Sequence, residues 1–129
     1  MKRFSEEELK RIQYEDIVEH PFCDASTLHM GVCNIFAKAL HDIYGYEICH
    51  IEYDKSFHDF CRTIANGQIV YIDVSGVSTD LRDLQPGRNV DEEKIIGNWT
   101  VELKDEFDWT AYDFAVHMIQ KYNDYYEIR

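Results

Sequence analysis

The stretch HDFCRTIA-NG-QIVYIDVS, residues 58–75, decides the fold. Two runs of strand-forming residues flank Asn66-Gly67, and Asn-Gly between two such runs is the strongest short-range signal for a β-hairpin with a two-residue turn. That turn fixes the register of the two strands, and counting outward from it places Phe60 opposite Asp73 and His58 opposite Ser75. The sequence therefore predicts which side chains of the hairpin lie next to each other.

His58 and Asp73 fall on the same face of this hairpin, because side chains alternate between the two faces of a strand. They are diagonal neighbours, with backbones about 5.5–8 Å apart, which lets an imidazole reach a carboxylate. Asp59 is the other acid near His58, and the register puts it on the opposite face. The hairpin thus predicts a His58–Asp73 pair.

Cys33 follows Gly31-Val32 and begins a segment with a broad apolar face at helical spacing that stops at Gly45. At the start of a helix, the positive end of the macrodipole stabilises a thiolate, and an unpaired backbone N–H is available to an oxyanion. A cysteine in this place is otherwise a small buried apolar residue. Cys33 is therefore the candidate nucleophile.

These three residues form a candidate catalytic set. His58 would act as the general base that takes the thiol proton and returns it to the leaving amine. Asp73 would orient the imidazole and stabilise its cation. The alternative is that His58 and Asp73 are solvated polar residues at strand ends.

The remaining segments predict a mixed architecture. Before Cys33, a capping box at Ser5 starts a helix that runs to Glu19 and is ended by Pro21, and 21–31 is a loop. Further expected elements are a strand over Tyr46–Tyr53, a turn over Asp54–Ser56, a connection over Val77–Val90, a short strand over Asn98–Leu103, and a helix from Thr110 with a stripe of Phe114, Ala115, Met118, Ile119 and Tyr122. This order predicts an α+β fold with helices on one side of an antiparallel sheet.

Length, composition and charge limit the classes of protein to which the chain can belong. At 129 residues, 45% apolar and 14% aromatic, we expect one domain over residues 1–129. The apolar runs are too short for a membrane span, and the start of the chain lacks the apolar core of a secretory signal, which predicts a cytoplasmic protein or one delivered by another route. The net charge of −12 opposes nucleic-acid binding and favours solubility or a basic partner.

No cofactor or metal is predicted. Without a secretory signal, free thiols are expected at Cys23, Cys33, Cys49 and Cys61. A zinc site is the main metal alternative, but no C-x-x-C spacing supports it. Its possible ligand sets are Cys23, His29 and Cys33, or Cys49, His50, His58 and Cys61. His20, His41, His50 and His117 have no partner that the sequence identifies, while His29 is close enough to Cys33 to line its site.

Together, these motifs resemble the papain-like cysteine enzymes, and within them the transglutaminase-like core. The resemblance covers about residues 31–76 and rests on the order in which the motifs follow one another along the chain. These motifs are Gly31-Val32-Cys33 at the start of a helix that contains Ala and Leu, then Gly45-Tyr46, His58-Asp59-Phe60, the Asn66-Gly67 turn, and Tyr71-Ile72-Asp73. It implies a compact fold in which the nucleophile helix packs on a small antiparallel sheet. It also implies that Cys33 is the nucleophile, His58 the base and Asp73 the orienting acid.

This chain departs from that family in three ways. Only 25 residues separate Cys33 from His58, which leaves little room for substrate-binding insertions. Thr27 stands six residues before Cys33, where papain-type proteases carry a glutamine that donates to the oxyanion, so the second oxyanion donor is unidentified. Phe60 replaces the usual tryptophan.

The expected function is acyl transfer from the carboxamide of a protein substrate through a Cys33 thioester. Water as acceptor gives deamidation or hydrolysis, and an amine gives transamidation. Compact members of the resembled family include bacterial effector and toxin-type glutamine deamidases. A cysteine peptidase is the first alternative, disfavoured by Thr27. A non-catalytic acidic domain that binds a basic partner, with a DNA-mimicking inhibitor as a special case, is the other.

Overall fold

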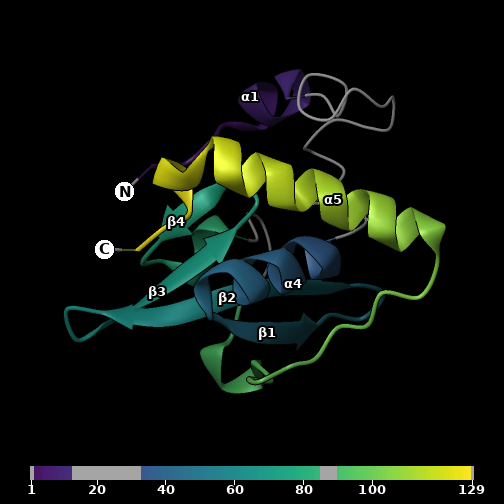
Figure 1. The fold of residues 1–129 in the computed structure, drawn as a ribbon. Coiled ribbons are helices and arrows are strands. Elements are labelled where there is room, and N and C mark those ends of the chain that lie inside the picture. The colour runs from purple at the N-terminus through teal and green to yellow at the C-terminus, as the bar shows by residue number, and fades with distance from the viewer. Residues whose placement is uncertain (1, 13–32, 85–89, 129) are drawn as a thin grey trace.

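The computed structural model describes residues 2–12, 33–84 and 90–128. It has a mixed α+β architecture, in which one small antiparallel sheet packs with helices (Figure 1). The helices are α1 (Glu6–Arg11), α4 (Cys33–Tyr44) and α5 (Glu106–Lys121), and the strands are β1 (Glu47–Glu52), β2 (Phe57–Ala65), β3 (Gln68–Asp73) and β4 (Gly76–Ser78). Three short 3-10 turns lie at Leu81–Asp83, Glu92–Lys94 and Asn123–Tyr125.

The sheet is an antiparallel meander in the order β1-β2-β3-β4. The predicted hairpin is confirmed: Ala65 pairs with Gln68, and the register continues outward to Cys61 opposite Ile72. Both turn residues have positive φ, 53° at Asn66 and 75° at Gly67, as a type I′ turn requires. The Asn-Gly sequence therefore sets the alignment of the two central strands.

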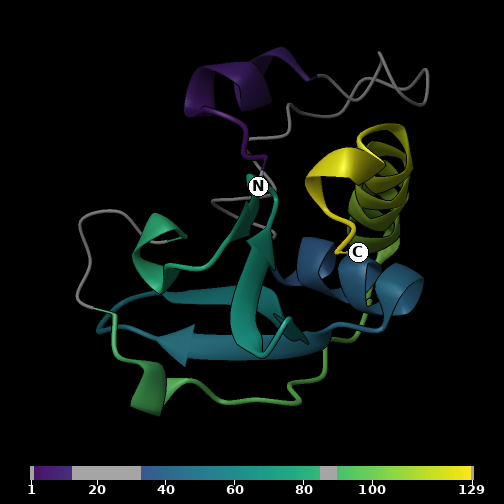
Figure 2. The same cartoon turned by 90° about the vertical axis from the view of Figure 1, so that its left-hand side faces the viewer.

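The two faces of the sheet are covered differently. On one face α4 lies against the strands and α5 lies against α4, so that both helices are on the same side (Figures 1 and 2). The other face carries a smaller apolar cluster, which Leu81 and Leu84 cover. Cys61 and Ile72 face the helical side, whereas Phe60 and Tyr71 belong to the smaller cluster, as alternation along a strand demands.

An N-terminal segment, residues 2–5, runs beside β4. Arg3 forms an antiparallel bridge with Gly76, and the Phe4 N–H donates to the Ser75 carbonyl. A Cβ at Gly76 would lie 2.3 Å from the Lys2 carbonyl oxygen, and its φ is +123°, so only glycine fits this close approach. Phe4 stacks on Tyr125 with ring centroids 3.8 Å apart, which joins this segment to the chain that follows α5.

Several expectations about the helices are corrected. The helix from Ser5 has its capping box but ends at Arg11, where buried Ile12 turns to extended backbone, and not at Glu19. Residues 13–32, with the expected Pro21 stop, the 21–31 loop and Gly31, lie outside the described residues. The last helix begins at Glu106 and not at Thr110, because the Asp105 side chain accepts from the Asp108 N–H and caps it.

Two expectations about the strands also change. Residues 98–103 do not form a strand: Asn98 has a φ of 49°, which interrupts the extended backbone, and Trp99 packs on His50. The stretch expected as a plain connection after Asp73 includes β4. The strand over 46–53, the helix ending at Gly45 and the buried stripe of α5 match the structure. Among the described residues, no helix has the length and apolarity that crossing a membrane requires.

Candidate functional site

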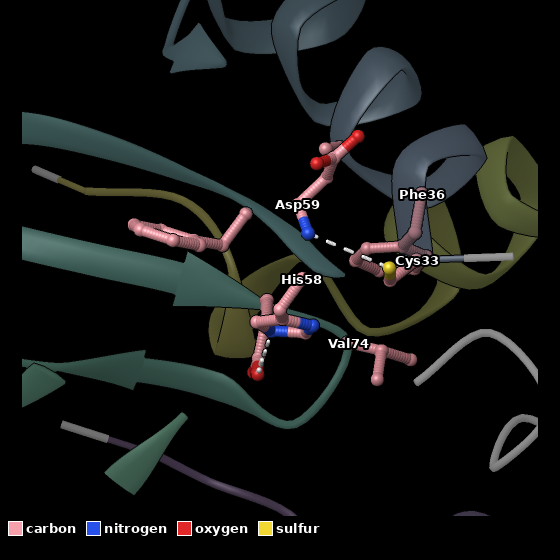
Figure 3. A pocket seen from close by; sticks show the side chains of 8 residues that line it. Cys33, Phe36, His58, Asp59 and Val74 are labelled. Atoms are coloured by element: carbon pink, nitrogen blue, oxygen red, sulfur yellow. Dashed lines mark hydrogen bonds and ion pairs between the residues drawn. The ribbon is translucent and has the colours of Figure 1, made fainter. Parts of the chain in front are cut away.

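Cys33 is the first residue of α4, and it lies at the end of the sheet where β2 and β3 part. The last pair between these strands is Cys61 with Ile72, so the Asp59 backbone lies beyond the ladder on that side. The Asp59 N–H donates to Cys33 Sγ at 3.5 Å (Figure 3). A backbone donor aimed at sulfur stabilises negative charge there, as the start of a helix also does.

The structure brings His58 and Asp73 together, as the hairpin register predicts. His58 Nε2 lies 3.6 Å from Asp73 Oδ2, and both side chains are buried. The His58 ring also stacks on Phe60, with centroids 5.8 Å apart. Strand alternation, a shared hairpin and one aromatic neighbour thus fix the position of the imidazole.

The Cys33 thiol also interacts with the His58 imidazole, through a hydrogen bond and through charge. Burial alone lowers the pKa of His58, but hydrogen bonds and charge from Asp73 and Cys33 outweigh it and raise the pKa to about 9. An imidazole with that pKa keeps its proton at neutral pH. The three predicted site residues therefore interact as one unit at the end of the sheet.

Asp73 has its two carboxylate oxygens directed to different partners. Oδ1 accepts from the Ser75 N–H at 2.9 Å and lies 3.6 Å from the Arg3 guanidinium. Oδ2 faces His58. The backbone just after Asp73 is held as well, since the Tyr126 hydroxyl donates to the Val74 carbonyl at 2.7 Å. The acid is thus held in one orientation by groups from the two ends of the described chain.

A narrow hollow separates these groups (Figure 3). Cys33, His58 and Asp73 are 7%, 1% and 3% exposed, so the sulfur, the imidazole and the carboxylate are all buried. The side chains that line it are Cys33, Phe36, Ala37, His58, Asp59, Phe60, Asp73 and Val74. Apart from Cys33, His58, Asp59 and Asp73, this lining is apolar.

Sequence reasoning missed a second histidine–acid pair. His50 Nδ1 lies 2.5 Å from Asp59 Oδ1, Nε2 lies 3.1 Å from Glu52 Oε1, and the ring stacks on Trp99 at 3.9 Å. Burial raises the pKa of Asp59, and the hydrogen bond from His50 offsets part of that rise. The signal was available: a four-residue turn at 53–56 pairs Glu52 with Phe57 and therefore His50 with Asp59.

The zinc alternatives find no support in the described part of the chain, where no group of three or more ligating side chains converges. Cys49 lies in the smaller cluster and Cys61 in the main core, on opposite faces of the sheet, so the second proposed ligand set is wrong. The first set includes Cys23 and His29, which lie outside the described residues. Cys33, Cys49 and Cys61 are free thiols.

Comparison with known proteins returned no matching family model, no matching curated protein and no matching solved structure. The likeness to the transglutaminase-like core therefore rests on the residues of this chain and stays a prediction.

Proposed function

We propose that this protein is a thiol enzyme that transfers an acyl group from a carboxamide of a protein substrate, with Cys33 as nucleophile, His58 as acid and base, and Asp73 as the orienting acid. The observation that carries this proposal is the convergence of Cys33 and Asp73 on one buried imidazole. A papain-like or transglutaminase-like relationship belongs to the same proposal.

The chemistry follows from the charge on His58. The Cys33 thiolate attacks the carboxamide carbon, a C–S bond forms, and the imidazolium gives its proton to the leaving nitrogen as the C–N bond breaks. Ammonia or an amine leaves and a thioester remains. His58 then takes a proton from water or from an acceptor amine, which attacks the thioester. The C–S bond breaks, and the acid or the new amide departs with the thiolate–imidazolium pair restored.

Two further features support this assignment. The Asp59 N–H and the start of α4 both direct partial positive charge at the sulfur. Among the cysteines that the structure describes, only Cys33 has a histidine as a hydrogen-bonding neighbour. The other two are thiols whose ionisation is disfavoured, because burial raises the pKa of Cys49 to about 12 and that of Cys61 well above its ordinary value.

Deamidation or transamidation remains preferred over peptide cleavage. The preference rests on Thr27, which stands where papain-type peptidases carry their oxyanion-donating glutamine.

The low exposure of Cys33 and His58 favours a second candidate, a non-catalytic acidic domain that binds a basic partner. In that case the buried polar cluster serves the fold alone. The two candidates differ in what the thiol does, because only an enzyme requires Cys33 for a chemical change in a partner.

Mass spectrometry of candidate partner proteins, incubated with wild type or with Cys33→Ala, separates these outcomes. A gain of about 1 Da at glutamine means deamidation, an amine adduct means transamidation, and a cut chain means peptidase activity. Cys49→Ala is the matched control, because it removes a buried thiol from the sheet face away from α4. Partners that bind equally well to wild type and Cys33→Ala, with no change in mass, would contradict the enzyme assignment.

A further inference from the structure

We propose that Arg3 is a positioning residue for the site: it is the second cation of Asp73, and it keeps that carboxylate ionised and oriented while His58 passes through its neutral form. The catalytic meaning of this role rests on the proposed function, whereas the charge balance itself rests on the geometry of three side chains.

The contacts of Arg3 place it on the acid but not on the nucleophile. Its guanidinium lies 3.6 Å from Asp73 Oδ1 and donates to the Asp83 carbonyl at 3.3 Å. The Arg3 side chain is about a quarter exposed, while that of Asp73 is almost completely buried. Burying a carboxylate costs free energy unless it has a cationic or hydrogen-bonding partner. Loss of the charge on Arg3 or on His58 therefore destabilises the ionised form of Asp73.

The N-terminal segment is built to hold Arg3 there. The bridge to Gly76 fixes its backbone beside β4, and the Val77 N–H donates to the Lys2 carbonyl at 3.3 Å. Phe4 stacks on Tyr125 and meets Tyr122 edge to face. The segment therefore presents the guanidinium from a position with fixed backbone on both sides of Arg3.

The need for a second cation arises within the reaction. After the imidazolium has given its proton to the leaving nitrogen, His58 is neutral and no longer compensates Asp73. With Arg3 present, the carboxylate remains paired, and His58 is free to take a proton from water or from an amine. Without Arg3, Asp73 would hold the imidazole in its charged form, and the second half of the reaction would slow.

The charged and titratable groups around His58 come from four elements. Asp73 on β3 and Cys33 on α4 stabilise the imidazolium. Burial raises the pKa of the neighbouring Asp59 on β2, and the charge of His58 in turn offsets part of that rise. Arg3 on the N-terminal segment opposes the imidazolium through its contact with Asp73. The carboxylate of Asp83 accepts a hydrogen bond from Ser78 Oγ at 2.5 Å, and the backbone carbonyl of Asp83 accepts one from Arg3.

The test is an NMR titration of the His58 ring in Arg3 variants. Arg3→Gln removes the charge, and we expect the pKa of His58 to rise by roughly one unit, since the Arg3 guanidinium then no longer offsets the negative charge of Asp73 beside the imidazolium. Arg3→Lys keeps the charge and should leave the titration close to that of wild type. Arg3→Met repeats the loss of charge with the aliphatic stem kept, so that the result does not depend on one variant folding.

Lys2→Gln is the matched control, because it removes one positive charge from the same segment. Its partner, Asp124, is exposed and lies outside the site. Equal His58 titrations in Arg3→Gln, Arg3→Met and Lys2→Gln would overturn the proposal. Because this measurement needs no substrate, its outcome is separate from that of the enzyme assignment. If both proposals hold, Arg3→Gln also slows release of the thioester more than its formation.

Discussion

In the described part of the chain, two buried histidine–acid pairs meet at β2, where Asp59 of one pair follows His58 of the other, and they differ in what surrounds the imidazole. In the His50–Asp59 pair, both ring nitrogens meet a carboxylate and Trp99 covers one face of the ring. In the His58–Asp73 pair, the acid shares its charge with Arg3, and a thiol reaches the ring. Similar residues are thus used once for structure and, in our proposal, once for chemistry.

A buried histidine–acid pair is therefore not by itself a sign of catalysis. Both ring nitrogens of His50 lie against carboxylate oxygens, so neither is open to a thiol. His58 interacts with an acid and with the Cys33 thiol, and a proton can pass between a thiol and an imidazole.

The largest effect on stability is expected at His50. His50→Ala should lower the free energy of unfolding by about 3 kcal/mol, because it leaves the buried Asp59 carboxyl group without its hydrogen-bond partner. His58→Ala should cost about 1–2 kcal/mol, since Arg3 remains on Asp73. Urea denaturation of both variants gives the comparison.

His117→Ala is the control for this experiment, because His117 is exposed and its ring bonds to the Asp113 carbonyl within α5. It should change stability by less than about 0.5 kcal/mol. A greater loss for His58→Ala than for His50→Ala would reverse the structural roles assigned to the two pairs.

A second difference concerns proton binding. The His58 ring should titrate with a pKa of about 9, and it should titrate lower in Asp73→Asn, because a neutral amide no longer stabilises the imidazolium. Resonances are assigned by comparison with His58→Gln. A wild-type His58 that titrates near its ordinary pKa of about 6.5 would contradict the interaction with Asp73 and Cys33.

The same shift predicts how the stability of the protein depends on pH. A folded imidazole with a raised pKa adds stability that is complete below about pH 6.5 and is lost as the pH rises through the folded value. The free energy of unfolding of wild type should therefore fall over this window, and the fall should be smaller in His58→Gln. His50→Gln should leave the fall in place.

The smallest effect is expected at the turn, because the turn lies at the far end of β2 from His58 and Asp59. Gly67→Ala places a side chain at a φ of 75° and should cost about 1 kcal/mol without changing the register. Both pairs should then survive, with the His58 titration unchanged. A shifted His58 titration in Gly67→Ala would contradict this prediction, because it would mean that the turn affects the surroundings of His58 even when the register of β2 and β3 is kept.

The parts of the fold that depend on neighbouring residues were predictable. Asn66-Gly67 determines the register between β2 and β3, and that register gave the His58–Asp73 pair. The apolar spacing after Cys33 gave α4, which ends before Gly45. In each case the signal lies within about ten residues, where local geometry leaves few alternatives.

The parts that depend on distant segments were not predictable. Nothing near Arg3 indicates that it meets Asp73, because their contact depends on the bridge to Gly76 and on the stacking of Phe4 with Tyr125. Residues 98–103 have strand-like composition, yet the φ of 49° at Asn98 interrupts the extended backbone where Trp99 packs on His50. Tertiary contacts outweigh local preference at both places.

The most direct test of the account is the rate at which iodoacetamide modifies each cysteine at about pH 6, where an ordinary thiol is almost entirely protonated. Peptide mass spectrometry gives a separate rate for each residue. We expect Cys33 to react about 100-fold faster than Cys49 or Cys61, with His58→Gln removing most of that advantage and His50→Gln leaving it in place. Equal rates at the three thiols, or a Cys33 rate that His58→Gln leaves unchanged, would contradict the claim that His58 activates Cys33.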